Sequence, residues 1–68
     1  MEMNAVGKFE VRRIINEIDG ILIRDFGVNM LDAKITREEA LSAYNEVNST
    51  TSAAHLCAER KGFPRISA

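Results

Sequence analysis

One apolar-rich stretch, residues 11–26, constrains the fold of this chain more than any other part of its sequence. Its apolar residues recur at steps of three and four, which is the spacing of one face of an α-helix. They are Val11, Ile14, Ile15, Ile18, Ile21 and Leu22. Charged and amide side chains fill the other side of the same helix. The pattern predicts an amphipathic helix whose apolar face must be buried by other parts of the protein or by a partner.

The expected helix covers residues 5–26, with Asn4 as a candidate N-cap. Gly27 suits the left-handed C′ position, where Val28 can contact Ile23 across a Schellman turn.

Gly20 is out of place in this helix, because an interior glycine costs roughly 1 kcal/mol against alanine. Asp19-Gly20 between Ile18 and Ile21 is also a short-range signal for a β-hairpin. The residues before it do not alternate between one apolar and one polar face, as a half-buried strand would. We therefore favour the helix, and a hairpin at this dipeptide is the alternative.

Two shorter helices are expected in the second half, at residues 37–47 and 52–61. Thr36 and Glu39 have the spacing of a capping box at the start of the first. Gly62 followed by Pro64 ends the second. With residues 28–35 as a connector, the sequence predicts an all-α, three-helix domain spanning residues 1–68.

A chain of 68 residues has room for only a small core, and such chains often add a disulfide, a metal or a second subunit. Cys57 is the one cysteine, so an internal disulfide is excluded. One cysteine and one histidine also make a poor zinc-ligand set, so we expect no metal and no cofactor. A homodimer remains, and the sequence predicts its interface on the first helix, with Gly20 at the closest approach of the two helices. The interface residues would be Ile14, Ile18, Ile21 and Leu22.

Charge and hydropathy limit the partners and the cellular compartment that the sequence predicts. Nine basic and ten acidic residues give a net charge of −1, without the basic excess typical of nucleic-acid binding. The first residues lack the pattern of a signal peptide, and charges interrupt every apolar segment before it reaches membrane-spanning length. A cytoplasmic protein with no membrane contact is the expectation, and the lone thiol fits it.

Few residues suggest chemistry. His55 and Glu59 lie one helical turn apart, a minimal acid–base or metal half-site, and we interpret them as a solvent-facing pair beside a small buried thiol. Asp25-Phe26-Gly27 spells the magnesium-binding triplet of protein kinases, but the other kinase motifs are absent and we interpret it as a helix ending. The sequence predicts no enzyme and no small-molecule substrate.

Residues 35–63 place two short helices around a compact turn, and the run NSTTSAAHL resembles the recognition helices of small bacterial helix-turn-helix regulators. The run departs from that pattern because Val47 stands where the family has a turn glycine. The resemblance implies DNA binding through residues 50–52 and the basic end of the last helix. Those residues are Thr50, Thr51, Ser52, His55, Arg60, Lys61 and Arg65.

A protein-interaction role is the interpretation we prefer. Two short helices cannot cover a helix of about 33 Å, at 1.5 Å per residue, so apolar surface remains for a protein partner. The expected anchors are Met30, Leu31, Tyr44 and Phe63. By analogy of size and charge balance, such a chain would be an inhibitor or modulator encoded by a phage or another mobile element.

Overall fold

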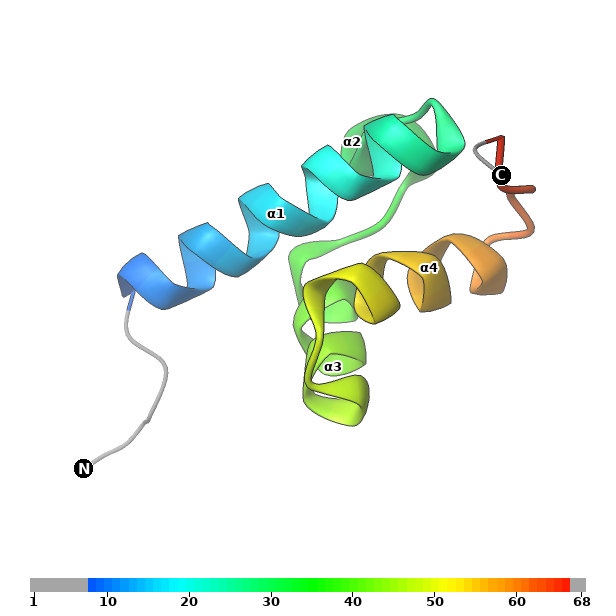
Figure 1. Ribbon diagram of the computed structural model, residues 1–68. Coiled ribbons are helices and arrows are strands. Elements are labelled where there is room, and N and C mark those ends of the chain that lie inside the picture. The colour runs from blue at the N-terminus through cyan, green and yellow to red at the C-terminus, as the bar shows by residue number, and fades with distance from the viewer. Residues whose placement is uncertain (1–7, 67–68) are drawn as a thin grey trace.

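The computed structural model describes residues 8–66, and these form four helices with no strand among them. The helices are α1 (Lys8–Phe26), α2 (Met30–Ala33), α3 (Arg37–Val47) and α4 (Thr50–Arg60). Figure 1 shows α1 lying across the other elements, with α2 beside its second half and α4 beneath it. The predicted all-α class is therefore confirmed, and the predicted number of helices is wrong by one.

Helix α1 runs through Asp19 and Gly20 without a break, so the hairpin alternative is wrong. It ends at Gly27, as predicted, where the backbone turns left-handed with a φ of 74°. The Gly27 N–H donates to the Ile23 carbonyl at 3.1 Å, a single bond of the αL type in place of the expected Schellman pair. The expected start of the helix at residues 5–7, and the proposed Asn4 cap, lie outside the described residues.

Helix α2 is the element that we predicted as a connector. The Asn29 side chain accepts the Asp32 N–H at 2.7 Å and so caps the N-terminus. At the other end Lys34 adopts a left-handed φ of 60°. The Ile35 N–H then donates to the Met30 carbonyl at 2.9 Å, which closes a Schellman motif without glycine. Because only one helical turn forms, the apolar periodicity was too short to reveal it.

Helix α3 begins as predicted. Thr36 Oγ1 accepts the Glu39 N–H at 3.1 Å, and a Glu39 carboxylate oxygen accepts the Thr36 N–H at 2.9 Å. Both halves of the capping box are thus formed. The helix ends at Asn48, which takes the left-handed conformation that glycine would otherwise supply.

Helix α4 starts two residues before its predicted position, because Ser49 is the cap and accepts the Ser52 N–H at 3.2 Å. Its end confirms the predicted role of Gly62, whose φ is 83°. The Phe63 N–H reaches the Ala58 carbonyl and the Gly62 N–H reaches the Glu59 carbonyl, each at 3.0 Å. This pair of bonds is the Schellman motif.

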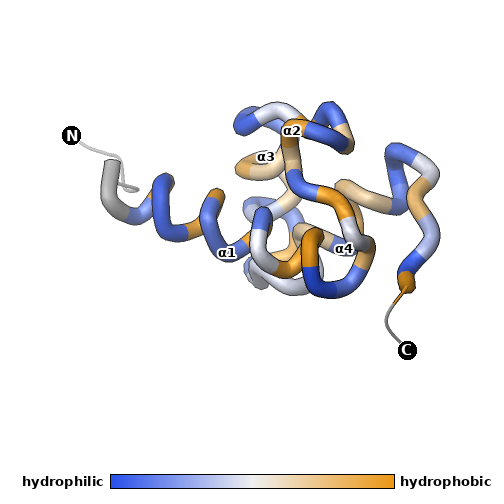
Figure 2. The backbone as a smooth tube through the Cα atoms, turned by 90° about the horizontal axis from the view of Figure 1, so that it is seen from above, coloured by the Kyte–Doolittle hydropathy of each residue, from blue (hydrophilic) through white to orange (hydrophobic). Residues whose placement is uncertain are grey.

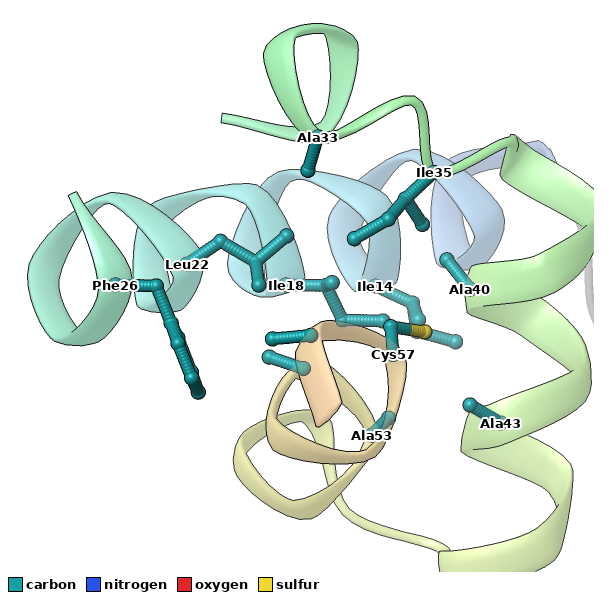
Figure 3. Packing of buried hydrophobic residues seen from close by; sticks show 12 residues of the cluster. Ile14, Ile18, Leu22, Phe26, Ala33, Ile35, Ala40, Ala43, Ala53 and Cys57 are labelled. Atoms are coloured by element: carbon teal, nitrogen blue, oxygen red, sulfur yellow. The ribbon is translucent and has the colours of Figure 1, made fainter. Parts of the chain in front are cut away.

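The core lies where α4 passes between α1 and α3. Figure 3 shows Ile14, Ile18, Leu22 and Phe26 of α1 turned toward α4, with Ala40 and Ala43 of α3 on a second side. The α4 residues that meet them are small, so the three helices approach closely. These fully or nearly fully buried residues are Ala53, Ala54, Cys57 and Ala58.

The first turns of α1 stand clear of the other helices, in the side view and from above (Figures 1 and 2). From Glu10 onward, where the burial of the side chains is described, Ile14 is the first buried residue of the helix. Arg13 pairs there with Glu10 and Glu17 at 2.9 and 3.1 Å, so this end is covered by exposed ion pairs. Across residues 8–66, none of the helices has the length and apolar character needed to cross a membrane.

Candidate functional site

A shallow groove lies between α1 and α2 on the surface of the described residues. It is lined by Ile15, Asn16, Asp19, Asn29, Met30, Leu31, Ile35 and Arg37. One hydrogen bond joins the two sides of the groove. A carboxylate oxygen of Asp19, in the middle of α1, accepts the Met30 N–H at 2.7 Å. Because this bond fixes the start of α2 beside α1, the side chain that follows Met30 is held at the mouth of the groove.

That side chain is Leu31, which remains 84% exposed. A large apolar side chain left in water is informative where it adjoins further apolar surface. Here Ile15 and Met30 are only partly buried, and both line the same groove. The site can therefore accept an apolar side chain of another molecule, with Asn16 and Arg37 available at its rim for polar contacts.

The four predicted partner-binding residues divide into two pairs. Met30 and Leu31 lie together at the groove. Tyr44 and Phe63 are partly buried and pack against the core, and neither lines the groove. The structure thus brings two of the predicted anchors together and separates the other two from them.

The predicted dimer interface is already occupied within one chain. Ile14, Ile18 and Leu22 are buried in the core, and Ile21 is partly buried against it. Gly20 faces outward, with no atom within 4 Å of the position that a Cβ would take. A homodimer stays a prediction, but in this conformation Ile14, Ile18 and Leu22 have no free surface to offer a second copy.

The residues expected to bind DNA do not form one basic face. Arg60 pairs with Glu46 at 3.2 Å, and Lys61 pairs with Glu39 at 3.1 Å. Arg65 donates to His55 Nδ1 at 3.0 Å.

The hydroxyl residues of this set lie at the start of α4. Thr51 and Ser52 are exposed there, while Thr50 is partly buried. The basic residues of the set lie at the other end of α4 and beyond it. Each of them already has an ion-pair or hydrogen-bond partner within the chain.

The structure also contains a cluster of polar side chains centred on Asp25, which the sequence did not predict. Asp25 is only 6% exposed. Arg24 donates to its two carboxylate oxygens at 2.8 and 3.0 Å, and His55 Nε2 approaches it at 2.8 Å. The hydrogen bonds from Arg24, and then from His55, hold the pKa of Asp25 well below its ordinary value.

This cluster corrects two interpretations. The ring nitrogens of His55 contact Asp25 and Arg65, so His55 is not part of a solvent-facing pair with Glu59. Asp25 does belong to a helix ending, but it also joins α1 to α4. A signal was present: Asp25 lies three residues after Leu22 and seven after Ile18, on the same face of the helix, where a carboxylate must be buried and paired.

Cys57 lies under a smaller hollow between α3 and α4, lined also by Ile35, Glu39 and Lys61 among others. Its thiol contacts the Glu39 carbonyl at 3.7 Å. Burial raises the pKa of this thiol above its ordinary value, which disfavours the thiolate form. The predicted small buried thiol is thus confirmed. Among residues 8–66, no three histidine, cysteine or carboxylate side chains come together as a metal site would require.

Comparisons with protein-family models, with curated proteins and with solved structures found no match to this chain. The geometry of the groove and of the Asp25 cluster therefore carries the functional argument.

Proposed function

We propose that this protein is a small regulatory module that binds a protein partner through the groove between α1 and α2. One observation carries the proposal: Leu31 is 84% exposed at the mouth of a groove lined by other apolar side chains. Exposed apolar side chains that adjoin further apolar surface mark sites of protein interaction, because binding removes them from water.

The groove is also held in place before any partner arrives. Asn29 caps α2, Lys34 closes it, and the bond from the Met30 N–H to Asp19 ties it to α1. A preformed surface loses less conformational entropy on binding than a loose loop. The fixed position of Leu31 therefore supports a specific contact over a nonspecific one.

Charge favours protein over DNA as the partner. The net charge is −1, which gives little long-range attraction to a polyanion. Arg60 and Lys61, which would steer DNA, are each in contact with a glutamate of α3. We infer that the module acts on its partner by occupying or reshaping the partner's surface.

An affinity pull-down from the source cell, with and without nuclease, tests this function. Leu31→Asp places a charge at the mouth of the groove, and we expect it to abolish recovery of the partner. Val47→Asp is the matched control, because Val47 is also an exposed apolar residue but does not line the groove. Circular dichroism should show equal helix content in both variants.

Two outcomes would contradict the proposal. In one, Leu31→Asp and wild type recover the same protein in equal amount. In the other, a short DNA sequence is recovered in place of a protein and its binding weakens steeply with added salt, as phosphate contacts require.

A further inference from the structure

Four side chains form a continuous polar chain at the C-terminal end of α1. Arg24 donates to Asp25, His55 contacts Asp25 at 2.8 Å through Nε2, and Arg65 contacts His55 at 3.0 Å through Nδ1. Thirty residues separate Asp25 from His55, and ten separate His55 from Arg65. The chain thus links α1, α4 and the segment after α4, which Figure 1 shows returning to the end of α1.

The two contacts of His55 fix its protonation state. A guanidinium can only donate hydrogen bonds, so Nδ1 must accept from Arg65 and carries no proton. An ionised carboxylate can only accept, so Nε2 carries the proton and donates it to Asp25. Both contacts exist together only in the neutral Nε2–H tautomer of the imidazole.

We propose that residues 64–66 form a strap that neutral His55 holds against the end of α1, and that protonation of His55 releases it. A second proton must go to Nδ1, the atom that accepts from Arg65. The hydrogen bond is then lost, and two positive groups face each other across 3.0 Å. Histidine is the side chain that ordinarily makes this change between pH 5 and 8.

The groups around His55 make the release local. From α1 it faces the Asp25 carboxylate, with Arg24 behind it, and the edge of the Phe26 ring at a centroid distance of 5.6 Å. From the strap it faces Arg65, and on its own helix Glu59 lies one turn further on. Protonation turns the contact with Asp25 into an ion pair, so α4 stays bound to α1 while the strap leaves.

The strap has few other attachments. The Ile66 N–H donates to the Asp25 backbone carbonyl at 2.7 Å. The Ile66 side chain lies close to Gly27 but remains largely exposed. Phe63 is held separately by the Schellman motif of α4, so the hinge lies at Pro64. Release therefore uncovers the Asp25 carbonyl and one edge of His55.

Nuclear magnetic resonance of the full chain tests the strap directly. His55 is the one histidine, so its ring signals report its titration without ambiguity. As pH falls from 8 to 5, we expect the Ile66 amide proton to shift upfield and its heteronuclear NOE to drop, with the midpoint of the His55 titration. The Ile18 amide, in the core, should not respond in this way.

Two variants test whether protonation of His55 releases the strap, or whether the His55–Arg65 contact has no influence on it. His55→Gln keeps a donor and an acceptor but does not titrate, so the Ile66 response should disappear between pH 5 and 8. Arg65→Met removes the donor to His55 Nδ1, so Ile66 should be released already at pH 8. An Ile66 amide that ignores the His55 titration, or that responds equally in His55→Gln, would overturn the proposal.

Discussion

Asp25 lies on the face of α1 that also carries Ile18 and Leu22, and this position decides how its charge is held. A carboxylate taken out of water is costly unless it is paired and hydrogen-bonded. The adjacent Arg24 supplies a two-pronged contact, and His55 supplies a third hydrogen bond from α4. Asp25 therefore provides a polar contact between α1 and α4, which otherwise meet through apolar side chains.

The pH dependence of this contact can be predicted from the pKa of Asp25, which the folded state lowers. A carboxyl with a lowered folded pKa stabilises the protein above its unfolded pKa, about 3.9 for aspartate. This contribution is lost as pH falls from there toward the folded value, because the unfolded chain binds the proton first. Asp25→Asn should thus destabilise the protein at pH 7, and its deficit relative to wild type should shrink below about pH 4.

Urea unfolding of wild type and Asp25→Asn between pH 7 and 2.5 measures this difference. Asp32→Asn, which removes an exposed carboxylate of α2, shows how much of the change any lost acid produces. A deficit for Asp25→Asn that stays constant down to pH 2.5 would show that the Asp25 charge does not stabilise the fold.

The three short helices owe their boundaries to side chains at their ends. Asn29, Thr36 and Ser49 each accept the amide N–H three residues on, at 2.7, 3.1 and 3.2 Å. A helix of one to three turns has few internal hydrogen bonds, so its end groups form a large share of its polar contacts. Lys34 and Asn48 then reverse the chain in left-handed conformations. The second half of the molecule thus consists of short helices whose ends are set by N-caps and by residues in the left-handed conformation.

Thr36→Ala tests the cap that forms a capping box with Glu39. Removing the hydroxyl leaves the Glu39 N–H without its acceptor, and we expect the free energy of unfolding to fall by about 1 kcal/mol. Thr51→Ala is the control, because Thr51 is exposed on α4 and is not a cap. Partner binding at the groove should not change with either variant. A loss of binding at unchanged stability would instead mark Thr36 as a contact residue.

Across the whole molecule, local signals predicted more of the fold than of the sites. The capping box at Thr36, the stop at Gly62 and the stripe on α1 involve residues within about one or two helical turns of each other, so the sequence alone revealed them. The bond from the Met30 N–H to Asp19 and the contact between His55 and Asp25 join residues 11 and 30 positions apart. No local pattern encodes which distant residues will meet, and both candidate sites depend on such contacts.

The same reasoning explains why the sequence pointed to a dimer through the stripe on α1. The length of that helix suggested that two short helices could not cover it. In the structure, α4 passes close to α1 because its facing residues are alanine and cysteine, and Ile14, Ile18 and Leu22 of the stripe are buried within one chain. Among the large apolar side chains of residues 8–66 that remain exposed, Leu31 at the groove is the most exposed, at 84%.

A matched pair of substitutions on α1 tests where the core of the molecule lies. Ile18 is fully buried, while Ile23 is 52% exposed on the same helix. Ile18→Val should lower the free energy of unfolding by about 0.5–1.5 kcal/mol, since a buried methylene is lost and a small cavity remains. Ile23→Val makes the same chemical change with much less burial at stake, and its effect should be clearly smaller. Equal losses would mean that Ile23 is also buried in solution, as an interface on that face of α1 would require.

Repeating the denaturation over a range of protein concentrations tests the predicted homodimer. A midpoint that rises with concentration shows that a second copy stabilises the folded state, and a midpoint that is independent of concentration would contradict the homodimer.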